Sequence, residues 1–97
     1  MKLTLTIIRD EDAEQVVDAL IASDFYVTRL PSTGGFLRTG NTTLLVGLED
    51  ERLEEMIETV KSRTRLRVQP PPSSSEEQVA VSRAVVFVLG LEELRKL

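Results

Sequence analysis

The chain has 97 residues, of which 41% are hydrophobic and 29% are charged, and this length suits one domain with a single core. It contains neither cysteine nor histidine, which excludes thiol nucleophiles, disulfides, histidine general bases and almost all zinc and copper sites. Sixteen acidic and twelve basic residues give a net charge of −4, and a field of that sign would repel nucleic acid. Any anionic ligand must therefore be held by local groups.

Neither a membrane span nor a secretion signal can be recognised in the sequence. The longest apolar run, AVVFVLGL at residues 84–91, is far shorter than the ~20 residues that cross a bilayer. The first residues, MKLTLTIIRD, lack the long apolar region and the small-residue cleavage site of a signal peptide. We therefore expect a cytoplasmic protein with one domain over residues 1–97.

The chain begins with a pattern typical of a strand followed by a helix. Residues 2–8 (KLTLTII) alternate and are rich in β-branched side chains, which predicts a strand. Residues 10–23 change to a helical period, with Asp10 or Asp12 as the expected N-cap. The apolar residues that this period places on one helix face are Ala13, Val16, Val17, Leu20 and Ile21.

Two further strands and a second helix follow. Residues 25–30 (FYVTRL) and residues 41–48 (NTTLLVGL) each predict a strand. Residues 49–63 have acidic side chains in the first turn and basic ones in the last, which predicts a helix ending near Arg63. Its apolar face consists of Leu53, Met56, Ile57 and Val60.

The last third of the chain contains a loop and a final strand. Residues 69–77 (QPPPSSSEE) predict an exposed loop, because consecutive prolines can continue neither a strand ladder nor a helix. Residues 78–91 (QVAVSRAVVFVLGL) predict the last strand, bent or bulged around Ser82. Residues 92–97 (EELRKL) are expected to add a short terminal helix.

The order β-α-β-β-α-β predicts an α+β fold of the ferredoxin-like class, a four-stranded antiparallel sheet with both helices on one face. The other face of this sheet has no cover. Because several strands carry Leu, Val, Ile and Phe on both sides, we expect the uncovered face to be buried against other subunits.

The segment STGGFLRTGNTTLLVG, residues 32–47, combines glycines with two bulky apolar residues. Gly34, Gly35 and Gly40 allow backbone amides to converge on an anion, and Phe36 could stack on a flat ring. The alternative is a structural hairpin in which Phe36 and Leu37 fold back onto the core. The side chains that could add hydrogen bonds to a ligand are those of Thr28, Thr33, Asn41 and Thr42.

Two other patterns have simpler explanations than catalysis. Residues 35–42 (GFLRTGNT) approach a P-loop, but Asn41 replaces the phosphate-binding lysine and a strand follows instead of a helix. The acidic runs at residues 10–12 and 49–51 each open a helix, so capping and helix-dipole compensation explain them better than a metal site. Arg29 and Arg38 flank the glycine-rich segment and could offset the acidic net charge near a phosphate.

TRLPSTGGFLRTGNTTLLVG at residues 28–47, together with AVVFVLGLEEL at residues 84–94, resembles the cyclic-di-AMP receptor family of PII-like signalling proteins. The resemblance implies a PII-like ferredoxin-like homotrimer that binds cyclic-di-AMP in clefts between subunits, without cofactor, metal or enzymatic activity. It also implies an unidentified protein target. The positions that match the family's ligand-contacting residues are Thr28, Gly35, Phe36, Leu37, Asn41, Gly47 and Phe87. The apolar strand around Phe87, taken by itself, predicts a core residue there.

Three residues differ from the family pattern: Asp24, Tyr26 and Lys96 stand where the family tends to have Asn, Arg and Gln. The loop before the last strand is also shorter. The changes at residues 24 and 26 weaken the attraction for a doubly charged ligand, and Lys96 restores one charge. The alternatives are therefore a PII-like trimer that binds a different adenine nucleotide, or a structural or interaction trimer without a small ligand. An enzyme is the least favoured class, because no base or nucleophile is evident.

Overall fold

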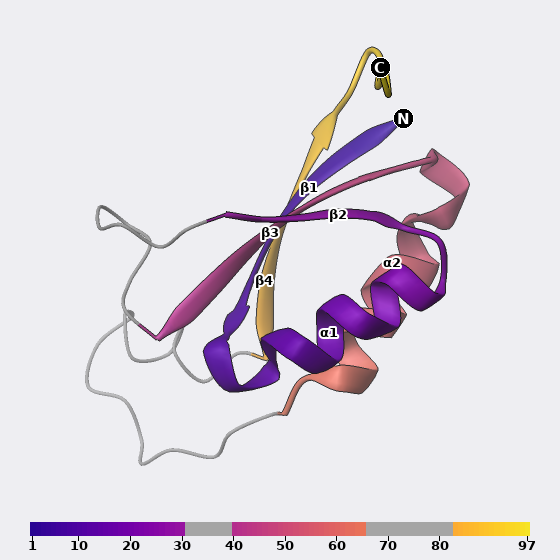
Figure 1. Ribbon diagram of the computed structural model, residues 1–97. Coiled ribbons are helices and arrows are strands. Elements are labelled where there is room, and N and C mark those ends of the chain that lie inside the picture. Colours follow the sequence, from indigo (N-terminus) through magenta and orange to yellow (C-terminus); the bar gives the residue numbers. More distant parts are fainter. Residues whose placement is uncertain (31–39, 66–82) are drawn as a thin grey trace, which may run out of the picture.

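The computed structural model describes residues 1–30, 40–65 and 83–97 of the chain (Figure 1). Four strands and two α-helices alternate in the order expected from the sequence. Both ends of the chain lie at the same end of the sheet. The elements are β1 (Lys2–Arg9), α1 (Asp10–Ala22), β2 (Tyr26–Leu30), β3 (Asn41–Leu48), a 3-10 turn (Asp50–Arg52), α2 (Leu53–Arg63) and β4 (Ala84–Gly90).

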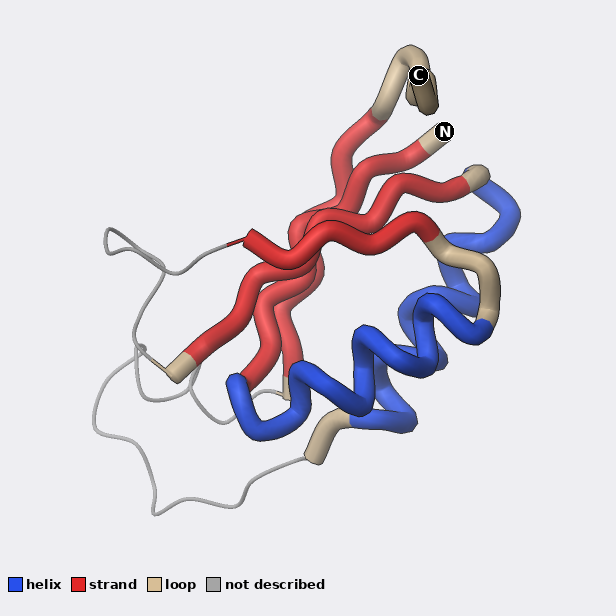
Figure 2. Tube along the Cα trace, in the orientation of Figure 1, coloured by secondary structure: helices blue, strands red, loops and turns tan. Residues whose placement is uncertain are grey.

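The four strands form one antiparallel sheet in the order β2-β3-β1-β4. Strand β1 therefore lies in the interior of the sheet, between β3 and β4, with Leu5 directly opposite both Leu45 and Phe87. Figure 2 shows both helices on the same side of the sheet. The α+β, ferredoxin-like architecture predicted from the sequence is thus confirmed.

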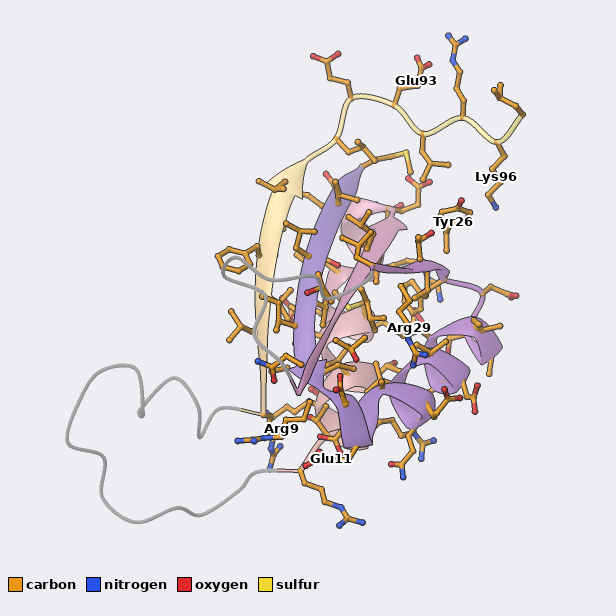
Figure 3. The ribbon with its side chains drawn as sticks, turned by 60° about the vertical axis from the view of Figure 1, so that its left-hand side comes forward. Arg9, Glu11, Tyr26, Arg29, Glu93 and Lys96 are labelled. Atoms are coloured by element: carbon orange, nitrogen blue, oxygen red, sulfur yellow. The ribbon has the colours of Figure 1, made fainter. Side chains whose placement is uncertain are left out.

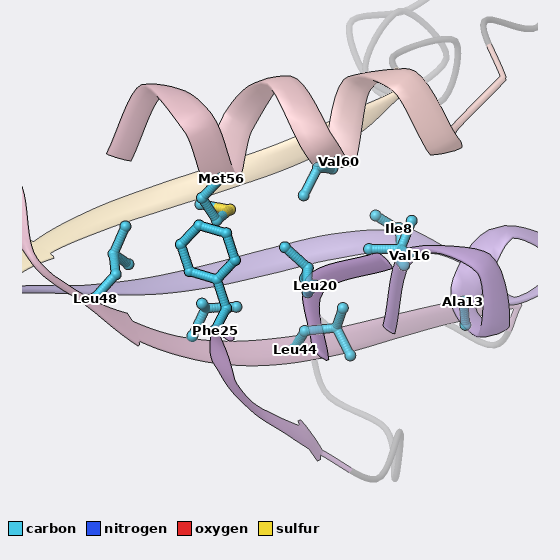
Figure 4. Close-up of a cluster of buried hydrophobic side chains, with 10 residues drawn as sticks. Ile8, Ala13, Val16, Leu20, Phe25, Leu44, Leu48, Met56 and Val60 are labelled. Carbon is cyan, nitrogen blue, oxygen red and sulfur yellow. The ribbon is translucent and has the colours of Figure 1, made fainter. Parts of the chain in front are cut away.

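The hydrophobic core fills the space between the sheet and the two helices (Figure 4). Because successive side chains of a strand point to opposite faces, Leu44, Val46 and Leu48 of β3 point into this core. Their neighbours in sequence point to the other face of the sheet. Helix α1 contributes Ala13, Val16 and Leu20, and α2 contributes Met56 and Val60; Ile8 and Phe25 complete the cluster. Both predicted helix faces therefore meet the sheet, as their 3.6-residue period requires.

The prediction for the last turn of α1 is wrong at one residue. Val17 packs against the core from its edge, but the Ile21 side chain is 57% exposed. Ala13, Val16 and Leu20 recur at intervals of three and four residues and already cover the sheet. Ile21 follows Leu20 by one residue, about 100° further round the helix, and so turns away from the sheet.

Neither predicted N-cap of α1 acts as one. The cap position is Arg9, whose side chain makes no capping hydrogen bond, because β1 runs directly into the helix without an intervening residue. Asp10 lies inside the first turn, where its Oδ1 accepts a hydrogen bond from the Thr42 hydroxyl at 2.5 Å. Asp10 therefore joins the start of α1 to the start of β3.

The predicted terminal helix at residues 92–97 does not form, since the chain after β4 continues without regular structure. A six-residue segment is too short to stabilise a helix by itself. Contacts with the rest of the molecule stabilise the end of the chain instead. In the first of these contacts, the Leu91 amide donates a hydrogen bond to the Met1 carbonyl at 3.0 Å.

The second helix differs from its prediction only at its beginning. The Arg52 amide donates to the Glu49 carbonyl at 3.0 Å, which makes residues 50–52 a 3-10 turn before α2 proper. The predicted loop at residues 69–77 and the bend around Ser82 lie outside the described residues. None of the described helices is long and apolar enough to cross a membrane.

Candidate functional site

The face of the sheet opposite the helices carries side chains in rows that cross all four strands. Residues directly opposite each other on antiparallel strands point to the same face. One row runs from Thr28 through Leu45 and Leu5 to Phe87. The next row runs from Tyr26 through Gly47 and Leu3 to Leu89. This surface, here called the open face, is largely apolar.

Thr28, Gly47 and Phe87, three of the candidate ligand-binding residues, therefore lie on the open face. Thr28 and Gly47 are diagonal neighbours on β2 and β3. Phe87 lies on β4, at the other edge of the sheet, three strand spacings or about 14 Å from Thr28. Its side chain is 51% exposed, so Phe87 does not belong to the core of this chain.

Asn41 also has the orientation of the open face but lies far from Gly47. It begins β3 opposite Arg9, whereas Gly47 lies near the other end of the strand, roughly 20 Å away. Gly35, Phe36 and Leu37 lie outside the described residues. Of the described candidates, the structure therefore brings only Thr28 and Gly47 together within one chain.

A pocket of about 480 Å³ opens where β2 begins and β3 ends. Gly47 lines it together with Asp24 and Tyr26, two of the three residues discussed above for their effect on the attraction of a charged ligand. The third, Lys96, reaches the same pocket from the segment after β4. Residues from three distant parts of the sequence thus meet at one place.

Arg52 braces the wall of this pocket. Its guanidinium group lies 4.0 Å from the centre of the Phe25 ring and donates from Nη2 to the Ser23 carbonyl at 2.7 Å. The same group forms a bidentate ion pair with Glu55. These contacts hold the turn at Asp24, which has a left-handed φ of 64°. The role of Arg52 could not be predicted from the sequence, because its spacing to Glu55 indicates the ion pair but not the contact with Phe25.

The segment after β4 forms another wall of the pocket (Figure 3). The Lys96 ammonium group lies 5.4 Å from the centre of the Tyr26 ring, which is within the range of a cation–π interaction. Leu94 occupies the space over Gly47, where a Cβ would approach its Cδ1 to 2.6 Å. Gly47 therefore has a packing role as well as its position beside Thr28, and nothing in the sequence pattern indicated Leu94.

Two further cations of the chain are already paired with carboxylates. The terminal ammonium of Met1 lies 3.0 Å from Asp50, and its hydrogen bond lowers the pKa of that carboxyl below its ordinary value of 3.8. Arg29 points toward α1 and pairs with Glu14 at 3.4 Å, so it does not serve the open face. Within the described parts of the chain, no group of three acidic side chains is placed to bind a metal ion.

The pocket and the open face offer an aromatic ring, a cation and apolar surface to a ligand. A crystal structure of a functionally unknown protein from Pediococcus pentosaceus is similar to this chain at 32% sequence identity, with a TM-score of 0.73. The similarity covers 99% of this chain and 96% of that one. The family model described as "Cyclic-di-AMP receptor" matches residues 1–97, the entire length. This chain therefore belongs to the cyclic-di-AMP receptor family.

Proposed function

We propose that this protein is a cytoplasmic signalling receptor that binds cyclic-di-AMP as a homotrimer and catalyses no reaction. The observation that carries the choice of ligand is the match of the whole chain to the receptor family. The geometry is consistent with a planar, anionic ligand, because Tyr26 and Lys96 lie beside each other in a pocket of suitable size. Such a receptor would pass its ligand state to a protein target.

We place the binding site between subunits. Thr28 and Phe87 share the open face but occupy opposite edges of one sheet. A ligand held at the pocket beside Thr28 would meet Phe87 more readily if a neighbouring subunit supplied it. Under this arrangement each ligand contacts the β2 edge of one chain and the β4 edge of the next. The proposed contacts are Thr28, Gly35, Phe36, Leu37, Asn41, Gly47 and Phe87.

The uncovered sheet face supports association of the chains. Phe87 and Leu89 are both about half exposed there, and Leu3, Leu5 and Leu45 are not fully covered. Contiguous apolar surface of this kind is uncommon on a monomeric protein and typical of an interface. A chain of 97 residues also gains much of its stability from burying such a face.

A second candidate is a PII-like trimer that binds a different adenine nucleotide. The Asp24 carboxylate lines the pocket, and Tyr26 supplies a ring where the family tends to have a cation. Both features reduce the attraction for a ligand with two phosphates. The exposed apolar face would equally suit a structural trimer with no small ligand, which is the third candidate.

Calorimetric titration of the purified protein with cyclic-di-AMP, cyclic-di-GMP, ATP and AMP separates these candidates. The proposal predicts saturable heat with cyclic-di-AMP and much weaker binding of the other three. Tighter binding of ATP or AMP would favour the second candidate. Absence of binding to all four, by a protein that is still trimeric, would favour the structural trimer.

A further inference from the structure

We infer that Asp10, the first residue of α1, is a positioning residue for the proposed ligand site and acts through Asn41. The inference rests on the proposed function, in which Asn41 contacts the nucleotide, and adds to it a residue of the helix layer. Asp10 itself does not touch the nucleotide under this arrangement. It forms hydrogen bonds to the residue before Asn41 and to the residue after it.

Asp10 contacts both sequence neighbours of Asn41. Its backbone amide donates to the Gly40 carbonyl at 2.9 Å, and its Oδ1 accepts a hydrogen bond from the Thr42 hydroxyl at 2.5 Å. The first bond satisfies an amide of the first helical turn, which has no acceptor within the helix. The second joins a hydroxyl to a carboxylate, and such a bond is shorter and stronger than one between neutral groups. One residue of α1 therefore restrains the backbone on either side of Asn41.

Asn41 needs this support because it lies at a corner of the sheet, where β3 begins near the start of α1 (Figure 1). Strand β2 pairs with β3 only as far as Thr43, so within the described residues Asn41 has a strand neighbour on the β1 side alone. Strand β1 itself ends at Arg9, directly opposite Asn41. Gly40 has a left-handed φ of 94°, a conformation that favours glycine. The bonds of Asp10 thus extend the connection between β1 and β3 beyond the last pair of the ladder.

Thr42 and Asn41 point to opposite faces of the sheet and so have different roles. Thr42 lies opposite Ile8, a core residue, and its side chain is buried on the helical side. The sequence indicates Thr42 as a possible ligand donor, but its hydroxyl donates to Asp10 instead. Asn41 has the orientation of the open face, and its side-chain amide has two donor hydrogens and an acceptor oxygen to offer a ligand. The contact between Asp10 and Thr42 therefore supports Asn41 from the side of the sheet that faces away from the ligand.

The test compares Asp10→Ala with Asp18→Ala, in which the same change is made at another exposed position of α1. Calorimetric titration with cyclic-di-AMP should show binding weakened about 5- to 10-fold in Asp10→Ala, because the apparent Kd rises as the fraction of chains with a correctly placed Asn41 falls. Asp18→Ala should bind like the wild type. Asp10→Asn should recover part of the affinity, since its side-chain oxygen can still accept the Thr42 hydrogen bond. Thr42→Val, which removes the hydroxyl at nearly constant volume, should weaken binding as Asp10→Ala does.

Amide hydrogen exchange of the ligand-free protein measures the support of Asn41 directly. Exchange at residues 40–42 should be faster in Asp10→Ala and Thr42→Val than in the wild type or Asp18→Ala, because these variants open the corner of the sheet more often. Equal exchange in all four proteins would overturn the positioning role.

A double-mutant cycle between Asp10 and Asn41 separates positioning from a general loss of stability. Asn41→Ala should itself weaken binding of cyclic-di-AMP, and Asp10→Ala should then have little further effect. Fully additive effects would overturn the role of Asp10, and so would an affinity of Asp10→Ala equal to that of Asp18→Ala. Both results would leave the proposed function intact. A wild type that does not bind cyclic-di-AMP would overturn the proposed function and this inference together.

Discussion

Single side chains join the segments that form the pocket. Arg52 joins three neighbours, the Phe25 ring, the Ser23 carbonyl and the Glu55 carboxylate. A planar guanidinium can satisfy all three at once, because it stacks through its face while it donates through its edge. The turn that places Asp24 and Tyr26 at the pocket is closed by backbone hydrogen bonds to the end of α1, and Arg52 adds a side-chain contact to it.

We expect Arg52→Ala to lower the free energy of unfolding by about 1–2 kcal/mol, the sum of one stacking contact and hydrogen bonds at a half-exposed site. Arg52→Lys should lower the free energy of unfolding by a smaller amount, since an ammonium group cannot form the bidentate pair. Urea denaturation measures both. Arg63→Ala, on the exposed side of the last turn of α2, is the control and should change little. An Arg52→Ala variant as stable as this control would contradict the bracing role.

A second prediction at this scale concerns Asp50. The hydrogen bond from the terminal ammonium of Met1 lowers its pKa below 3.8. Because the folded-state pKa is lowered, the ion pair favours the folded protein above the ordinary value and is lost as the pH falls through the lowered one. Titration of the Asp50 carboxyl by NMR should therefore give a pKa below 3.8. A value at or above 3.8 would show that the pair does not form in solution.

At the scale of the elements, α1 presents a narrow apolar face to the sheet. Leu20 is completely buried within the core cluster, whereas the next residue, Ile21, is mostly exposed. The two residues therefore offer a matched comparison of an interior and a surface position in one helical turn.

Leu20→Ala should reduce the free energy of unfolding by roughly 2–5 kcal/mol, because it removes transfer energy and leaves a cavity. Ile21→Ala should lower the free energy of unfolding much less, since the Ile21 side chain buries little of its surface on folding. Chemical denaturation of both variants by urea provides the comparison. Similar losses in the two variants would mean that α1 is rotated relative to the sheet.

The sequence was sufficient to predict the elements but not the way in which they build the pocket. Periods of two and 3.6 residues placed all four strands, both helices and most of the core, because burial against the sheet enforces these periods. The local sequence pattern did not predict the structure where contacts between distant segments determine it. The end of the chain is one such place, because Leu94 packs on Gly47 there. It also failed at Asp10, whose carboxylate binds Thr42 instead of capping a helix.

For the candidate site, the sequence could indicate which residues share a face of the sheet but not which of them meet in the pocket. The face shared by Thr28, Gly47 and Phe87 follows from strand register, which the sequence can suggest only through alternation. Asp24, Tyr26 and Lys96 stood out in the sequence as departures from the family pattern. Their meeting in one pocket required the path of the chain after β4, and residues 92–97 carry no pattern that encodes that path.

At the scale of the whole molecule, one sheet face is covered by helices and the other is open. Leu89 lies on the open face of the edge strand β4 and is 47% exposed, and Ile21 lies on α1, on the helical side. If the open face mediates trimer formation, a charge at Leu89 should disrupt the assembly and a charge at Ile21 should not.

Leu89→Glu is expected to dissociate the proposed trimer and to abolish cyclic-di-AMP binding together, because the proposed site needs two subunits. Ile21→Glu should retain both properties. Light scattering determines the assembly and calorimetry the binding. Undiminished ligand binding by a monomeric Leu89→Glu protein would place the site within one chain.

The central claim is that three copies of this chain bind cyclic-di-AMP between them. Native mass spectrometry of the wild-type protein with the nucleotide measures assembly and occupancy in the same spectrum. The account predicts a particle of three times 10.8 kDa that carries one cyclic-di-AMP for each chain. A single chain with bound nucleotide, or a trimer that takes up none at saturating concentration, would contradict it.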